Sequence, residues 1–154
     1  MWDVAYLAAS QFIENSMFIS IEGGDGTGKT TQAHLLAKNL KDIGSDVVLV
    51  HEPGGTELGE MLRSWLKKTG REISPPAELL AFGAARAELV ENIIKPALAK
   101  GTIVVADRYC DSTTAYQGYG HELPLDVIER VNSIATQGLY PDLTFILDLS
   151  LIHI

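Results

Sequence analysis

The 154-residue sequence has one cysteine and few basic residues, and each of these shortages argues against certain kinds of structure or binding. A single cysteine, Cys110, cannot form an intramolecular disulfide, which fits a reducing compartment such as the cytoplasm. The 12 Lys and Arg residues are outnumbered by 20 Asp and Glu residues, which gives a formal net charge of -8. Without a basic block, the chain is not expected to bind nucleic acid or an anionic membrane through a broad charged surface.

The start of the sequence also lacks the features of a secretory leader. Residues 1–16 contain no Lys or Arg and no clear cleavage site, and they are too few and too polar to cross a bilayer. Because Met17 begins a run that reads as a native start, we expect residues 1–16 to be a non-native N-terminal extension; a short amphipathic surface helix is the alternative. With 46% hydrophobic residues, the chain is expected to bury one core, in a single domain over residues 17–149.

Short apolar runs alternate with longer helical segments along this domain. Alternation of this kind predicts a parallel sheet, and runs that are apolar on successive residues predict strands covered on both faces. The predicted strands are 18–22, 46–50, 102–106 and 144–149. Helices are expected over 29–43, 58–68, from 75 to an end between 96 and 101, 112–117 and 124–137. The predicted class is α/β, a parallel sheet with helices on both faces.

A phosphate-binding loop follows the first predicted strand. Residues 23–30 read GGDGTGKT and match the P-loop pattern of Gly, four residues, Gly, Lys, then Ser or Thr. Glycines let backbone N–H groups turn around phosphate oxygens, and the following helix adds the positive end of its dipole. Lys29 is placed to bridge the β- and γ-phosphates, and Thr30 to ligate Mg²⁺. The residues expected to bind ATP are Gly23, Gly24, Asp25, Gly26, Thr27, Gly28, Lys29, Thr30 and Thr31.

A charged pair, Asp107 and Arg108, follows the third predicted strand. Because the carboxyl ends of parallel strands converge on the ligand crevice, Arg108 is expected to grip a phosphate with its planar fork. Asp107 is expected to hold a water of Mg²⁺ or to orient Arg108, so Thr30 and Asp107 are the candidate metal residues. We predict that Lys29, Asp107 and Arg108 form the catalytic group; a surface ion pair at 107–108 is the alternative. A GTPase is disfavoured because the sequence has no Asn-Lys-x-Asp element.

Three further segments indicate the family. Residues 50–63 read VHEPGGTELGEMLR, 78–86 read ELLAFGAAR and 107–118 read DRYCDSTTAYQG. Together with the P-loop and the closing PDLTFILDL, they are similar to bacterial thymidylate kinases across nearly all of residues 17–149. The resemblance implies a P-loop NTPase fold of the nucleoside monophosphate kinase type. It also implies an enzyme that uses ATP and Mg²⁺ to phosphorylate dTMP to dTDP for dTTP biosynthesis, as a homodimer when full length.

The resemblance further implies a dTMP pocket that faces the phosphate loop. Phe82 resembles the ring that stacks on thymine, Arg86 the donor to a thymine carbonyl and Thr113 the partner of the base N3. Arg86 lies one helical turn after Phe82 and so on the same face. By itself, Phe82 also fits a plain core residue.

The sugar and the phosphate of dTMP have their own matches in the family pattern. Tyr116 resembles the residue beneath the sugar, where a ribose hydroxyl would clash, although a helix-packing role fits it too. Asp25 matches the carboxylate that holds the 3′-hydroxyl, and Arg108 matches the ligand of the acceptor phosphate. The full set expected to bind substrate is Asp25, Glu52, Pro53, Arg63, Phe82, Arg86, Arg108, Thr113, Tyr116 and Gln117.

The sequence departs from the family pattern at several places. His51 stands where the family usually has an arginine, and histidine is mostly neutral at pH 7, so weaker acceptor binding is expected. The phosphate loop has no arginine, and the family's lid, fifth strand and final helices do not follow within the chain. Since loss of a transition-state arginine typically costs about 10³–10⁵ in rate, an incomplete domain with impaired activity is expected.

The closing LSLIHI also differs from the family, and it can be read as the translation of a transposon adapter end. We therefore expect residues 150–154 to be a non-native tail. Two other functions stay open from the sequence: a P-loop nucleotide-binding module without catalysis, and a kinase for another nucleoside or nucleotide.

Overall fold

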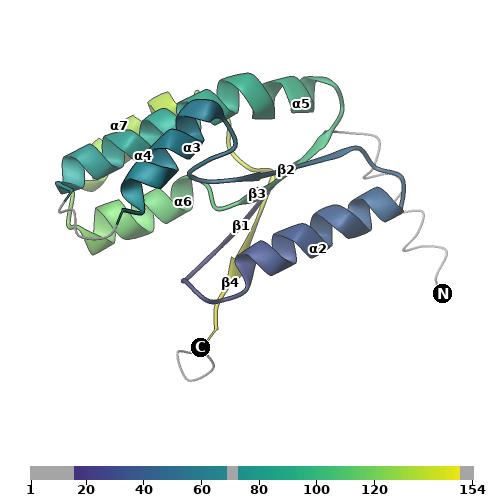
Figure 1. Ribbon diagram of the computed structural model, residues 1–154, viewed down its shortest axis with the longest axis horizontal. Helices are drawn as coiled ribbons and strands as arrows, with labels where there is room; N and C mark the ends of the chain where they lie inside the picture. The colour runs from purple at the N-terminus through teal and green to yellow at the C-terminus, as the bar shows by residue number, and fades with distance from the viewer. Residues whose placement is uncertain (1–15, 69–72, 150–154) are drawn as a thin grey trace.

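A four-stranded parallel sheet forms the centre of the computed structural model, which describes residues 16–68 and 73–149 (Figure 1). All three strand pairings are parallel. The spatial order is β2-β3-β1-β4, with bounds β1 (Phe18–Gly23), β2 (Val47–His51), β3 (Ile103–Asp107) and β4 (Leu143–Leu147). Each predicted apolar run overlaps one of these strands, so the α/β class with a parallel sheet is confirmed.

Helices cover both faces of the sheet, as the apolar runs predict. Helix α2 (Lys29–Asp42) lies on one side and the remaining helices lie on the other (Figure 1). These are α3 (Glu57–Leu66), α4 (Pro75–Leu89), α5 (Lys95–Ala99), α6 (Cys110–Thr113) and α7 (Leu125–Thr136).

Two helical segments contain wide π turns that the periodicity did not predict. The long helix expected from residue 75 is α4, the π turn η1 (Val90–Ile94) and α5 in succession. Pro96 has no amide N–H, which fits the loss of regular α-helical bonding just before it. The helix expected over 112–117 starts earlier, as α6, and continues as the π turn η2 (Thr114–Gly120).

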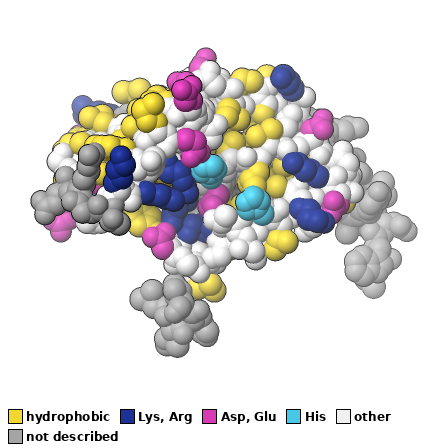
Figure 2. Space-filling model, viewed as in Figure 1, with side chains coloured by type: hydrophobic (Ala, Val, Ile, Leu, Met, Phe, Trp, Pro, Cys, Tyr) yellow, Lys and Arg dark blue, Asp and Glu magenta, His cyan; other side chains and the backbone are white. Residues whose placement is uncertain are grey.

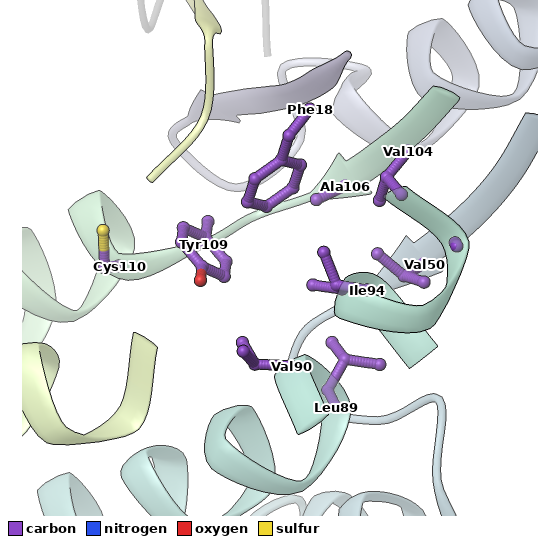
Figure 3. Packing of buried hydrophobic residues seen from close by; sticks show 10 residues of the cluster. Phe18, Val50, Leu89, Val90, Ile94, Val104, Ala106, Tyr109 and Cys110 are labelled. Carbon is purple, nitrogen blue, oxygen red and sulfur yellow. The ribbon is translucent and has the colours of Figure 1, made fainter. Parts of the chain in front are cut away.

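Side chains that alternate along the strands build a hydrophobic core on each face. On one face Phe18 and Tyr109 meet edge to face, with ring centroids 4.9 Å apart, above the buried residues of α4, η1 and α5 (Figure 3). On the other face Ile19, Ile21 and Val105 pack on Ala33 of α2 and its neighbours. Because β1 and β3 are buried on both faces, the segments that follow them are held in place.

Strand β4 lies at the edge of the described sheet. Phe145 is 44% exposed and Ile146 is 73% exposed, so this edge carries apolar side chains in contact with water. Of the expected extension at 1–16, residues 1–15 lie outside the described residues, as does the expected tail at 150–154. Within the part that the structure describes, no helix is both long and apolar enough to cross a membrane.

Candidate active site

One cavity of about 610 Å³ is lined by the segments that follow β1, β2 and β3 together with α3, α4, α6 and η2. Every residue that the resemblance assigns to substrate binding lines it. In Figure 2, Lys and Arg side chains gather on the face shown, beside histidine and acidic side chains. The loop residues Asp25, Gly26, Gly28, Lys29 and Thr30 line the cavity, whereas Gly23, Gly24, Thr27 and Thr31 do not.

The loop between β1 and α2 folds around the Lys29 side chain. Lys29 is only 6% exposed; its Nζ donates to the Gly24 carbonyl and lies 3.5 Å from Thr27 Oγ1. Burial is the main cause that lowers the pKa of Lys29, and the nearby charge of Arg108 adds to it. Gly23 has φ 144° and a side chain there would meet the Leu147 carbonyl, so the loop can begin only with glycine. The Lys29 ammonium therefore contacts the Gly24 carbonyl and the Thr27 hydroxyl of the loop.

Thr30 and Asp107, the candidate metal residues, lie next to each other. Thr30 lies in the first turn of α2 and Asp107 ends β3, and the Thr30 hydroxyl donates to Asp107 Oδ2 at 2.6 Å. A hydroxyl and a carboxylate oxygen are ligands that suit Mg²⁺, which keeps several of its waters. The donor set therefore fits the expected cation.

Arg108 reaches from the end of β3 across to the phosphate loop. Its backbone is left-handed, with φ 72°. One Nη donates to the Asp25 carboxylate, and the other donates to the Gly23 carbonyl at 3.1 Å and to Ser112 Oγ at 2.9 Å. Its guanidinium carbon lies 5.2 Å from the centre of the Tyr116 ring. The phosphate loop and Arg108 therefore lie at the same end of the sheet, where the parallel strands β1 and β3 end.

Arg86 forms a buried polar network at the other end of the cavity, where it is 1% exposed. Its Nε donates to Glu52 Oε2 at 2.8 Å and its Nη1 to Asn132 Oδ1 at 2.9 Å. Its Nη2 donates to Thr113 Oγ1 at 2.9 Å and to the Tyr109 carbonyl at 3.2 Å. Burial opposes the charge of Arg86, but the adjoining carboxylate prevails and raises its pKa. Among the described residues, Glu52 Oε1 is buried without a hydrogen-bond partner.

Comparison with known proteins decides the family. The family model described as thymidylate kinase matches residues 21–152. The chain belongs to the thymidylate kinase family. A thymidylate kinase from Dehalococcoides mccartyi strain 195 is 53% identical over 87% of this chain and 65% of its own length. One from Gloeobacter violaceus is 54% identical over 86% of this chain and 63% of its own length.

A crystal structure of thymidylate kinase from Ehrlichia chaffeensis has the same fold, with a TM-score of 0.81 and 49% identity. The match covers 87% of this chain and 72% of that one. The predicted P-loop fold of the nucleoside monophosphate kinase type is therefore confirmed. The chain spans about 65% of the length of the Dehalococcoides thymidylate kinases.

The segment that carries the thymidylate kinase signature EPGGT borders the cavity. The Glu52–Pro53 peptide bond is cis. Arg63 of α3 donates to the Pro53 carbonyl at 2.8 Å. His51, at the position where an arginine is usual in the thymidylate kinase family, lies 2.9 Å from Glu60 through its Nε2. Glu60 also accepts the Gly55 amide, and this hydrogen bond is the main cause of its lowered pKa.

Sequence reasoning missed Glu22, a buried carboxylate near the end of β1. It accepts the Tyr109 amide at 2.7 Å and the Ser112 hydroxyl at 2.6 Å. Burial raises the pKa of Glu22, and these two hydrogen bonds pull it back. The available signal was a charged residue inside an otherwise apolar strand, FISIEG.

Asn132 and Glu78 were missed as well. Asn132 lies on the buried stripe of α7, one turn after Ile128, so a polar residue at an apolar position was its signal. Glu78 lines the cavity, accepts from Gln117 Nε2 at 2.5 Å and lies 3.3 Å from His121 Nε2. No pattern in the sequence pointed to Glu78, because its partners come from η2 and the turn that follows.

Proposed function

We propose that this chain carries the ATP and dTMP sites of a thymidylate kinase, which transfers the γ-phosphoryl group of ATP to the 5′-phosphate of dTMP. The observation that carries the proposal is the position of Arg108, whose guanidinium donates to the phosphate loop and lines the same cavity as Lys29 and Thr30. Two phosphate-binding elements that face each other provide the in-line geometry that phosphoryl transfer needs.

Catalysis here consists of positioning and charge neutralisation. The acceptor phosphate of dTMP has a second pKa near 6, so it is mostly ionised at neutral pH and needs no strong base. Lys29 neutralises charge on the β- and γ-phosphates, and Arg108 holds the acceptor phosphate. Thr30 and Asp107 are placed to hold Mg²⁺, which when bound neutralises further charge on the phosphate oxygens.

The remaining cavity residues select the nucleotide. Phe82, half-buried on α4, stacks on thymine, while Arg86 and Thr113 bind its polar edge. Tyr116 lies under the sugar and disfavours a ribose, and Asp25 accepts the 3′-hydroxyl. The protein is expected to act in dTTP biosynthesis in the cytoplasm, as a homodimer.

Binding measurements by isothermal titration calorimetry test the proposal directly. The chain should bind ATP with Mg²⁺, and it should bind dTMP more tightly than uridine or guanosine monophosphate. Tighter binding of either ribonucleotide would favour a kinase for another nucleotide and contradict the roles given to Phe82, Arg86 and Thr113. Binding of ATP without binding of dTMP would favour a nucleotide-binding module.

The phosphate loop is tested separately through its lysine. Lys29→Ala should weaken ATP binding by about 10- to 100-fold, because it removes charged hydrogen bonds to phosphate. Lys38→Ala is the matched control, since Lys38 is an exposed lysine of the same helix paired only with Asp42. Unchanged ATP affinity in Lys29→Ala would contradict the phosphate loop.

A further inference from the structure

Glu22 lies on β1, the strand that leads into the phosphate loop, and is linked to both the backbone and the side chain of the Arg108 region. It is 4% exposed, in a strand whose other side chains are mostly apolar. Its Oε1 accepts the amide of Tyr109, the residue after Arg108, and its Oε2 accepts the Ser112 hydroxyl. That hydroxyl oxygen in turn accepts Nη1 of Arg108 at 2.9 Å. One buried carboxylate thus fixes the peptide next to Arg108 and the hydroxyl that holds its guanidinium.

The backbone of Arg108 needs such support. A φ of 72° lies in the left-handed region, which typically costs a residue with a Cβ atom about 1–2 kcal/mol. The Arg108 amide donates to the Ile21 carbonyl at 3.1 Å, so the residue is tied to β1 on its N-terminal side. The Tyr109 amide, tied to Glu22, holds it on the C-terminal side. Both ties come from β1, the strand that leads into the phosphate loop.

When Glu22 is ionised, its carboxylate also sets the direction of the hydrogen bonds around Ser112. Because a carboxylate can only accept, the Ser112 proton must point to Glu22 and leaves the oxygen lone pairs free for Arg108. A glutamine side chain has an NH₂ donor in place of one carboxylate oxygen. It therefore cannot accept hydrogen bonds from both the Tyr109 amide and the Ser112 hydroxyl in the same arrangement. A Gln at this position therefore keeps the volume and the Tyr109 bond but disturbs the bond to Ser112.

We propose that Glu22 is a positioning residue for Arg108, which it holds in the conformation that binds the acceptor phosphate. The inference rests on the proposed function, in which Arg108 is the ligand of the dTMP phosphate. Glu22 makes no direct contact with the nucleotide in the proposed complex. It acts only through Ser112 and the backbone of residues 108–109.

The affinity ratio between dTMP and thymidine tests the proposal, because these ligands differ only in the phosphate. Calorimetry on the full chain should show that Glu22→Gln reduces this ratio about 10-fold, the typical effect of a weakened charged hydrogen bond. Thymidine affinity should stay within about twofold of the parent value. Glu129→Gln, on the exposed side of α7, is the matched control and should leave both affinities unchanged.

A double variant separates positioning from general support of the fold. If Glu22 acts through Arg108, adding Glu22→Gln to Arg108→Ala should not lower the dTMP-to-thymidine ratio below that of Arg108→Ala alone. Should Glu22→Gln fail to fold, Ser112→Ala carries the test, because it removes the link between Glu22 and the guanidinium. Ser112→Ala is also expected to lower the ratio, with thymidine binding unchanged.

Two results would overturn the proposal. One is an unchanged ratio in Glu22→Gln, or in Ser112→Ala when that variant carries the test. The other is equal weakening of dTMP and thymidine, which indicates a structural role only. Failure of the proposed function looks different, because the parent chain would then bind dTMP no better than thymidine.

Discussion

Arg86 and Arg108 line the same cavity, yet they differ in burial and in the kind of partner they bind. The side chain of Arg86 is 1% exposed and four of its five N–H groups donate to buried protein atoms, which leaves one N–H of Nη1 for a ligand. The side chain of Arg108 is 19% exposed and binds Asp25, whose own side chain is 86% exposed. A ligand phosphate can replace an exposed carboxylate at small cost, whereas the Arg86 partners are part of the core.

The difference implies that the two ends of the cavity are built differently. The base end, around Arg86, is held together by hydrogen bonds within the protein and contributes to the stability of the fold. At the phosphate end, Lys29 and Arg108 rest on atoms of the loop, and those contacts must be exchanged when phosphates bind. Mutations should therefore separate stability at one end from phosphate affinity at the other.

The largest expected effect is a loss of stability in Arg86→Ala. Removing the guanidinium leaves the Glu52 carboxylate buried without its cation, which typically costs about 3–5 kcal/mol. Urea unfolding measures this loss, and Arg130→Ala is the control because Arg130 is an exposed residue of α7 paired with Asp126 at 3.5 Å. A loss in Arg86→Ala no larger than in the control would contradict a structural role for the base end.

The opposite pattern is expected for Arg108→Ala. Unfolding free energy should change little, since its partner Asp25 returns to water. The dTMP affinity should fall by about 10- to 100-fold, because a charged hydrogen bond to phosphate contributes roughly 1.5–3 kcal/mol, while thymidine affinity stays the same. If Arg108→Ala unfolds as readily as Arg86→Ala, the contrast between the two ends is wrong.

A smaller effect is expected on the pH dependence of stability, because the phosphate end also contains a buried acidic residue, Glu22. Since burial raises the pKa of Glu22 above its ordinary value of 4.5, the folded chain keeps a proton that the unfolded chain releases. The stability contributed by Glu22 is therefore full below about pH 4.5 and falls as the pH rises through the raised value. Each unit of pKa difference corresponds to about 1.4 kcal/mol.

Urea unfolding of the parent and of Glu22→Gln between about pH 4 and 7 measures this contribution. The parent should lose stability relative to the variant as the pH rises, because the variant has no proton to release at this position. Glu129→Gln controls for the loss of one acidic residue at an exposed position. A parent that gains on the variant towards neutral pH would show that the hydrogen bonds to Glu22 outweigh its burial.

The sequence was informative where a residue's role depends on its neighbours in the chain. Strands of a parallel sheet appear as apolar runs, so β1 to β4 and the parallel sheet were predictable. Coverage on both faces was a wrong prediction for β4, where Phe145 and Ile146 are exposed. The phosphate loop was predictable because its geometry needs glycines at fixed spacing before Lys29. The π turns were not, since they depend on how the helices bend around Pro96 and on the packing of η2.

Partners far apart in the chain were the main limit on predicting the site. Glu22 and Ser112 are 90 residues apart, and Arg86 and Asn132 are 46 apart, so no local pattern joins them. The place of Arg108 beside the phosphate loop was predictable from its position after a strand. Its contact with Asp25 was not, because side-chain partners are set only when strands β1 and β3 pair.

The smallest expected effect is a gain in acceptor affinity at His51, on the side of the cavity reached from β2. An arginine there carries a charge that does not depend on pH, but Glu60 lies 2.9 Å from this position and will neutralise part of it. His51→Arg should therefore tighten dTMP binding only about two- to fivefold at pH 8, with thymidine unaffected. His34→Arg, on the exposed side of α2, adds the same charge elsewhere. An equal gain in both variants would mean that net charge alone attracts the nucleotide, and that position 51 has no part in the phosphate end of the cavity.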